Sequence, residues 1–382
     1  MNSAFKSIYL PAAIALGAGA FGAVLAVFLR VPAPFLTGPA TMVTLAALAG
    51  LPVGIPARLR DPFFLLIGMN VGAAVTPEAV ATAARWPGSL LALALAVTVM
   101  MALGAFFMRR VIGLDRLPAL LAATPGHLSF VLSIAEEGEA DTRRVALVQS
   151  LRVLFLTLLV PVLVQLLDRG PLPEPSARAV TALWLLVPMG LAALALGLVF
   201  KRLNLPAALL LGGMAVSGVL HGSGSMTGQF PPWLTAVGFT FMGSLIGTRF
   251  NGVTIRMFLG AIIASFTLTS LAALTALVFA VPVSMLLGVP LVAVVIAFAP
   301  GGLETMMAMS VLLDANPAYV AAHHVFRLFF LSALIPFAVA RTRRSLARAQ
   351  NAGGAGGQRP QGEGEASQKG GKDTSGDDHE GR

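Results

Sequence analysis

Two segments that interrupt long apolar stretches constrain the fold of this chain more than any other feature. Residues 124–129 read TPGHLS and residues 299–304 read APGGLE. Proline removes a backbone donor and breaks a helix, and inside a bilayer the groups left unpaired are satisfied only by other protein or by a water-filled cavity. The two segments therefore predict an internal polar site inside a helical membrane protein.

The two breaks occupy the same place in two copies of one pattern. Pro125 and Pro300 are 175 positions apart, and the same offset relates these further pairs: Gly68 and Gly243, Gly72 and Gly247, Leu128 and Leu303, Arg152 and Arg327, and Pro161 and Pro336. One ungapped register over roughly a hundred residues indicates a duplication. We predict a first membrane repeat at 1–168, a linker at 169–178, a second membrane repeat at 179–345 and a disordered tail at 346–382.

The balance of residue types is that of a multi-pass membrane protein. Hydrophobic residues make up 57% of the chain, charged residues only 11%, and the mean hydropathy is +0.84. Runs of about twenty apolar residues recur, which is enough for a helix to cross about 30 Å of hydrocarbon, whereas a β-barrel would show short alternating segments. The predicted fold is all-α and polytopic, with about 10–12 transmembrane helices.

Two short segments decide how the repeats are oriented. Segments 35–52 and 205–220 both contain an early proline, and each could cross the membrane or stop short of it. If both cross, there are twelve spans, the repeats are parallel, and loop Lys and Arg divide as twelve inside and eight outside. If neither crosses, each half has five spans, the repeats are inverted, and the division is ten and ten. Charge favours twelve spans, whereas broken helices that meet at the midplane favour inverted repeats, the arrangement that we adopt.

Charge and motifs exclude several function classes. The net charge of +9 comes from short loops beside hydrophobic ends, as the positive-inside rule describes, so we expect no nucleic-acid partner. The chain has no cysteine, which excludes disulfides, thiolate metal sites and a cysteine nucleophile. A phosphate-binding loop, a dinucleotide fingerprint and zinc spacings are absent from the sequence, so we expect no cofactor, ATP hydrolysis or dehydrogenase chemistry.

Charged residues inside apolar helices are the first candidates for a site. Glu304 follows the second break directly, where it could bind a proton, a cation or a substrate, or could simply compensate the dipole of the helix that begins there. Arg152 and Arg327 occupy equivalent positions in the helices after each break. They could bind an anionic substrate, or they could satisfy carbonyls that the breaks release, and we favour the second role.

Uncharged residues complete the candidate site. His323 and His324 are adjacent and point about 100° apart on a helix, so they cannot chelate one ion, and no metal site is predicted. Gly68 and Gly72 have the G-x-x-x-G spacing that allows close helix packing, and we assign them no ligand. Gln149 and Thr124 could bond to substrate or to a neighbouring helix. The predicted substrate or ion site comprises Glu304, Arg327, Arg152, Pro300, Gly301, Gly302, Pro125, Gly126, His127, Ser129 and Asn70.

Four blocks of the sequence form a recognisable pattern: RVPAPFLTGPA at 30–40, IGMNVGAAVTPE at 67–78, and the long blocks at 124–153 and 299–328 that contain the two breaks. These blocks resemble the AbrB-type duplicated membrane protein family of Gram-negative bacteria. The resemblance implies an inner-membrane protein, and family members are labelled regulators of gene expression or ammonia monooxygenases. The family's first block tends to read Pro-Gly-Gly-Leu-Ser-Glu, whereas here His127 replaces the second glycine and Phe130 replaces the acid. A more distant resemblance, to the bile-acid symporter and cation/proton antiporter fold, also implies interrupted helices in inverted repeats.

These observations lead to one expected function and two alternatives. We expect a transporter-like protein of the bacterial inner membrane, with a cytoplasmic C-terminal tail, that moves a small solute, with an anion suggested by the two arginines. Its partners would be the lipid bilayer and a small molecule or ion, with homo-oligomerisation left open. One alternative is a membrane-associated regulator of gene expression without transport activity. The other is a metal-dependent ammonia monooxygenase, which the few histidines do not support.

Overall fold

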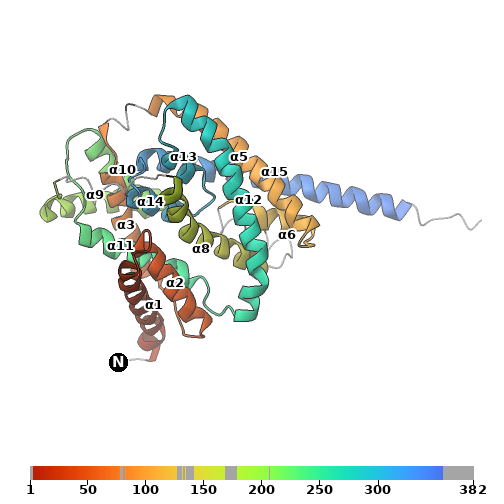
Figure 1. Ribbon diagram of the computed structural model, residues 1–382, viewed down its shortest axis with the longest axis horizontal. Coiled ribbons are helices and arrows are strands. Elements are labelled where there is room, and N and C mark those ends of the chain that lie inside the picture. Colours follow the sequence, from red (N-terminus) through yellow and green to blue (C-terminus); the bar gives the residue numbers. More distant parts are fainter. Residues whose placement is uncertain are drawn as a thin grey trace, which may run out of the picture. The chain divides into compact units, whose positions relative to one another are not determined.

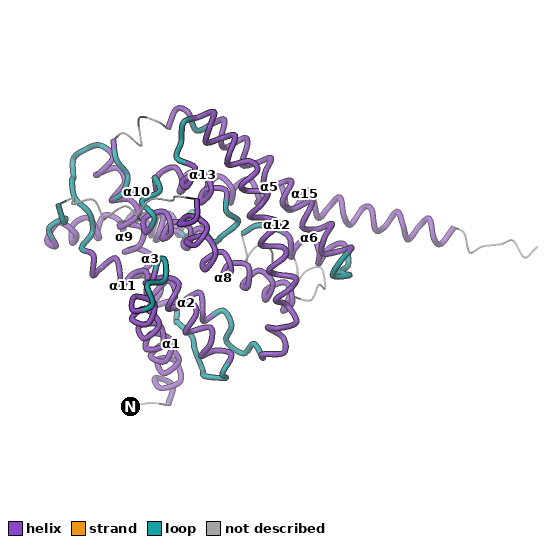
Figure 2. The backbone as a smooth tube through the Cα atoms, in the orientation of Figure 1, coloured by secondary structure: helices purple, strands orange, loops and turns teal. Residues whose placement is uncertain are grey.

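The computed structural model describes residues 3–77, 81, 83–126, 131, 134, 142–167, 179–205 and 207–355. Within these ranges the chain forms thirteen α-helices, one short 3₁₀ helix and no strand (Figures 1 and 2). The helices are α1 (Ser3–Phe28), α2 (Pro34–Leu48), α3 (Ala57–Ala73), η1 (Ala83–Arg85), α5 (Pro87–Arg110), α6 (Arg116–Ala123), α8 (Thr142–Leu167), α9 (Leu183–Arg202), α10 (Ala208–Gly222), α11 (Pro232–Thr248), α12 (Ile255–Leu287), α13 (Leu291–Phe298), α14 (Leu303–Leu312) and α15 (Pro317–Ala355).

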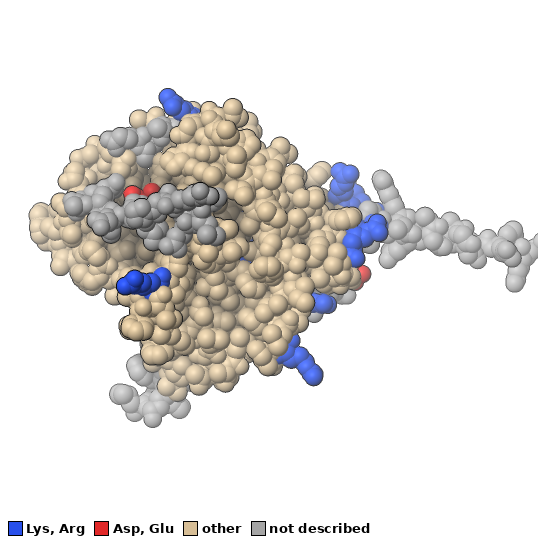
Figure 3. Space-filling view, in the orientation of Figure 1, with Lys and Arg blue, Asp and Glu red and all other residues tan. Residues whose placement is uncertain are grey.

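Six of these helices are long and apolar enough to cross a membrane. The six apolar stretches are Tyr9–Phe28, Pro87–Arg110, Arg143–Leu163, Leu183–Arg202, Ile255–Leu287 and Pro317–Thr342. Large apolar side chains on them face outward: Phe28 and Leu286 are each 82% exposed. On the face drawn in Figure 3, charged side chains are few. Because such a surface is compatible with lipid, the chain is an all-α polytopic membrane protein, as the sequence predicts.

The chain divides into two compact units, Met1–Val339 and Ala340–Arg382. Almost all of both expected repeats lies inside the first unit. Helix α15 continues to Ala355, so the first part of the expected tail at 346–382 is helical, and the rest lies outside the described residues. Its Ala, Arg, Leu and Gln residues are strong helix formers, which accounts for this extension into a segment that composition alone predicts to be disordered.

The helix boundaries repeat with the same offset as the sequence motifs. Helices α3 and α11 begin at Ala57 and Pro232, which are 175 positions apart, like Pro125 and Pro300. The first residues of α6 and α13 have the same separation, and so do those of α8 and α15. Ala33 and Ala207, which precede α2 and α10, both have the unusual φ of 50°, and their separation is one residue shorter than that offset. The register that relates the motifs therefore also relates the helices.

The G-x-x-x-G segments pack helices of one expected repeat against those of the other. A Cβ added to Gly68 of α3 would lie 2.1 Å from the Leu210 carbonyl oxygen of α10, and one added to Gly243 of α11 would lie 2.4 Å from the Leu36 carbonyl oxygen of α2. This confirms that these glycines are packing residues. Since α2 corresponds to α10 and α3 to α11, the two contacts are reciprocal, as in a two-fold symmetric interface.

We expect Gly68→Ala to lower the free energy of unfolding by about 1–3 kcal/mol, because the added methyl group must push apart two helix backbones. Thermal unfolding of the purified protein in detergent, followed by circular dichroism, measures the effect. Gly260→Ala is the matched control, since a Cβ there meets nothing within 4 Å, and we expect it to be neutral or stabilising. Equal unfolding curves for Gly68→Ala and the wild type would contradict the close contact.

Candidate functional site

The second break separates two short helices that follow one another in the sequence. Helix α13 ends at Phe298, α14 begins at Leu303, and residues 299–302 are not helical. The released carbonyl groups are bound by one arginine of α15. Arg327 donates from Nη1 to the Ala299 oxygen at 2.5 Å and from Nη2 to the Gly301 oxygen at 2.6 Å. The guanidinium therefore satisfies backbone groups that the break would leave unpaired.

The first break has the equivalent arrangement. Helix α6 ends at Ala123, and Gly126 has a φ of +95°. The Nη1 atom of Arg152, on α8, donates to the Thr124 oxygen at 2.8 Å. Thr124 and Ala299 are themselves equivalent positions of the two expected repeats, as are the two arginines. Both arginines are only 1% exposed, so each break contains a buried cation bonded to its backbone.

One further residue supports each arginine. Gln149 donates from Nε2 to the Leu121 oxygen at 3.0 Å, and its Oε1 accepts a hydrogen bond from Arg152. At the equivalent position, Nε2 of His324 donates to the Ile296 oxygen at 3.0 Å. Its Nδ1 accepts a hydrogen bond from Nη2 of Arg327 at 2.8 Å. His324 is therefore the neutral imidazole that carries its hydrogen on Nε2. Glutamine and histidine thus play the same role at equivalent positions.

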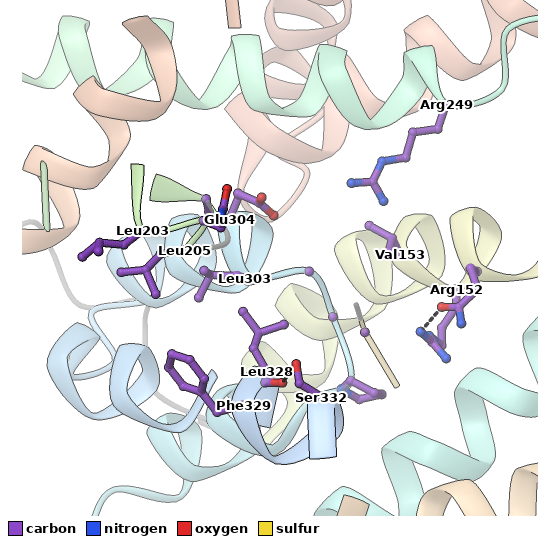
Figure 4. Close-up of a pocket in the computed structure, with 17 residues that line it drawn as sticks. Arg152, Val153, Leu203, Leu205, Arg249, Leu303, Glu304, Leu328, Phe329 and Ser332 are labelled. Carbon is purple, nitrogen blue, oxygen red and sulfur yellow. Dashed lines mark hydrogen bonds between the residues drawn. The ribbon is translucent and has the colours of Figure 1, made fainter. Parts of the chain in front are cut away.

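The two breaks meet, as expected from the repeat. A Cβ added to Gly126 would lie 3.6 Å from Nη2 of Arg327, so the first break touches the arginine that binds the second. Residues of both breaks line one cavity of about 810 Å³. Its lining comprises Gly126, Gln149, Arg152, Val153, Leu203, Asn204, Leu205, Ala207, Arg249, Pro300, Gly301, Gly302, Leu303, Glu304, Leu328, Phe329 and Ser332 (Figure 4).

Glu304 places a carboxylate at this cavity. It is the second residue of α14, in the first turn, and it is half-buried. The residue that precedes the helix, Gly302, has no side chain to cap it, so the positive end of the helix dipole faces the cavity beside Glu304. Within the described part of the chain, Glu304 forms no hydrogen bond and no ion pair through its side chain. Its carboxylate is therefore available to a ligand.

Arg249 and Asn204 line the cavity although their sequence context does not single them out. Arg249 follows α11, and its side chain extends into the cavity in Figure 4. In sequence it looks like an ordinary loop charge beside an apolar helix, so only the packing of α11 reveals its place. Asn204 precedes α10 and has a φ of 55°, and Arg30, which precedes α2, has a φ of 53°. Asparagine tolerates this conformation better than most residues, which is the one signal that the sequence offers.

The structure brings most of the predicted site residues together. Six of them line the cavity: Gly126, Arg152, Pro300, Gly301, Gly302 and Glu304. Pro125 is the neighbour of Gly126, and Arg327 binds the second break from α15. Asn70 is buried in α3 and is not part of the lining. His127 and Ser129 lie outside the described residues.

The described residues contain no metal-ligand cluster: among them, no group of three or more His, Cys, Asp or Glu side chains is placed to hold a metal ion. His323, the neighbour of His324, bonds instead to the Tyr319 oxygen at 2.7 Å and to the Ser89 hydroxyl at 2.7 Å. The two adjacent histidines therefore bind different partners.

Comparison with known proteins adds a family and two relatives. A family model described as "Transition state regulatory protein AbrB" matches residues 35–343. The "Uncharacterized protein YhjN" of Bacillus subtilis (strain 168) is 34% identical over 245 residues, which are 58% of this chain and 62% of that protein, so the match spans about three fifths of the relative. The "Putative regulator AbrB" of Escherichia coli (strain K12) is 27% identical over 308 residues, which are 78% of this chain and 87% of that protein.

Proposed function

This chain belongs to the AbrB family, and from that premise we propose that it is a transporter-like membrane protein that moves a small solute through the cavity between its two helix breaks. The observation that carries the proposal is the cavity itself, which both breaks line and which has a volume of about 810 Å³. Ligand pockets are typically about 300–1,000 Å³ and combine an apolar lining with a few polar groups. The lining here has that composition.

The arrangement of the helices supports the same proposal. Helices α2 and α10 have 15 residues each and so extend about 22 Å, which is less than the roughly 30 Å of a hydrocarbon core. If neither crosses fully, each half has five crossings and the repeats are inverted. Inverted repeats with broken helices around a central site are a recurring plan of secondary transporters, in which the two repeats move against one another.

We further propose that the protein lies in the bacterial inner membrane with its C-terminus in the cytoplasm. The support is the basic cluster at the end of the last candidate span and just after it, Arg341, Arg343, Arg344 and Arg348, since cytoplasmic ends of membrane helices are enriched in Lys and Arg. The relatives described above are bacterial proteins.

A role in regulation is the second candidate, and the printed names favour it. The family description and the name of the Escherichia coli relative both refer to a regulator. In this alternative the cavity would sense a small molecule, and the membrane protein would pass the signal to a partner without moving the molecule across. The two candidates differ in a single measurable property, the net flux of solute.

We expect Gly302→Phe to reduce uptake to no more than about a tenth of the wild-type rate, because a filled cavity cannot enclose its ligand. Gly302 lines the cavity with a φ of −68°, which any residue adopts. A Cβ there would meet only side-chain oxygens of Glu304 and Thr305, at 3.5 and 3.6 Å, so a Cβ atom fits without moving the backbone. Uptake is measured in proteoliposomes with a panel of labelled amino acids, succinate and methylammonium.

Gly302→Ala is the control, and it should keep most of the wild-type uptake because a methyl group leaves the cavity open. Wild-type uptake no faster than that of empty liposomes, for every member of the panel, would contradict transport and favour regulation. Undiminished uptake in a folded Gly302→Phe protein would show that the solute takes another route.

A further inference from the structure

The two buried arginines already have partners. Arg327 directs both terminal nitrogens at backbone oxygens of the second break and at His324, and Arg152 directs its terminal nitrogens at Thr124 and Gln149. The Nε atoms have no partner among the described residues, but a single Nε cannot form the two parallel bonds with which arginine binds a carboxylate. An anionic group of a ligand therefore needs a different cation.

Arg249 is the cation that remains available. No hydrogen bond or ion pair involves its side chain in the described part of the chain. Its guanidinium extends from the end of α11 into the cavity in Figure 4. The planar group can donate two parallel hydrogen bonds to one carboxylate, which a partnered arginine cannot do.

Glu304 faces the same cavity and also lacks a partner among the described residues. The two groups are not joined by an ion pair, for which nitrogen and oxygen would have to lie within 4.0 Å, yet both line the same cavity. A site with one unpaired cation and one unpaired anion is matched by a ligand that has both charges. A simple anion would leave Glu304 without a partner in the occupied cavity, and a simple cation would leave Arg249 without one.

We propose that the cavity binds a small zwitterion of the α-amino acid class, with its carboxylate on Arg249 and its ammonium group on Glu304. An α-amino acid carries both groups on one carbon atom, so it can contact two charges that line one cavity without forming an ion pair with each other. The apolar part of the lining, which includes Leu203, Leu205 and Phe329, surrounds an apolar side chain. The identity of the transported solute rests on the proposed function, whereas the binding site itself can be tested without transport.

The test measures binding of three matched probes to the full-length protein in lipid nanodiscs by isothermal titration calorimetry. L-Leucine is the zwitterion, 4-methylpentanoate lacks its ammonium group, and 3-methylbutylamine lacks its carboxylate. We expect leucine to bind at least about tenfold more tightly than either of the others, because each of the other two probes lacks one of the charge-assisted hydrogen bonds. In Arg249→Gln, leucine should bind no more tightly than 3-methylbutylamine, because the partner of its carboxylate is gone. In Glu304→Gln, leucine should bind no more tightly than 4-methylpentanoate, because the partner of its ammonium group is gone.

Arg256→Gln is the matched control, because Arg256 is an exposed arginine on α12 outside the cavity lining, and leucine binding should not change. Equal affinity for leucine and 4-methylpentanoate would overturn the zwitterion in favour of an anion site and leave the proposed transport intact. Equal affinity for leucine and the amine would overturn it in favour of a cation site. Binding of none of the three would also overturn it. Leucine binding without any flux would keep the site and remove the transport function.

Discussion

Arg327→Leu is expected to lower the free energy of unfolding by about 3–5 kcal/mol, a large part of the roughly 5–15 kcal/mol that stabilises a typical protein. The substitution leaves three buried acceptors without a donor: the Ala299 oxygen, the Gly301 oxygen and Nδ1 of His324. Each unsatisfied buried group costs about 1–3 kcal/mol, and relief of the buried charge offsets part of the total. Titration with sodium dodecyl sulfate in mixed micelles, followed by tryptophan fluorescence, measures the loss.

Two variants show whether the hydrogen bonds cause this loss. Arg327→Lys should be intermediate, because an ammonium group can donate to the carbonyls but lacks the planar fork. His324→Gln should cost less than about 1 kcal/mol, since Gln149 already bonds to a carbonyl and to an arginine at the equivalent position. Wild-type stability in Arg327→Leu would show that the break does not depend on the arginine.

The breaks could be predicted from the sequence because their effect on the backbone is local. The Pro-Gly pairs end the helices before them, whereas the single prolines Pro161 and Pro336 lie inside α8 and α15. Two copies of the pair in one register make a chance pattern improbable. Helices α6 and α13 accordingly end at Ala123 and Phe298, which are equivalent positions of the two expected repeats. The expectation that the arginines satisfy released carbonyls follows from the same local reasoning, and the structure contains those bonds.

Other parts of the site depend on packing between distant helices. Arg249 reaches the cavity because α11 packs closely against α2 through Gly243 and Gly247, a contact that sequence alone does not place in space. Asn70 is a polar residue in an apolar helix and for that reason is expected at the site, yet α3 buries it away from the lining. The composition of one helix does not determine which of its faces meets the cavity.

The shared role of Gln149 and His324 is hidden in the sequence for a chemical reason. Their side chains differ, so a comparison of residue types at equivalent positions does not pair them. A carbonyl oxygen accepts from any suitably placed N–H group, and an amide and an imidazole both provide a donor and an acceptor. The duplicated feature is therefore the hydrogen-bond pattern, and that pattern becomes visible only with the positions of the Leu121 and Ile296 oxygens.

Glu304→Gln is expected to lower the initial rate of solute uptake into proteoliposomes at least about tenfold, because it removes the one carboxylate of the described cavity lining and with it a charge-assisted bond of about 1.5–3 kcal/mol. Thermal unfolding should change little. Glutamine has nearly the same shape, and Glu304 has no partner among the described residues to lose. The remaining cost is the lost interaction with the helix dipole, about 0.3–1 kcal/mol.

The comparison with Asp314→Asn separates a role in the cavity from a general effect of removing an acid. Asp314 follows the other end of α14, is exposed, and lies outside the cavity lining, so its replacement should leave uptake unchanged. Glu304→Asp keeps the charge but draws it back by one methylene group, and we expect partial uptake. Full uptake in a correctly folded Glu304→Gln protein would remove Glu304 from the mechanism. Equal losses of uptake in Glu304→Gln and Asp314→Asn would show that the effect does not arise in the cavity, because of these two acids Glu304 lines the cavity and Asp314 does not.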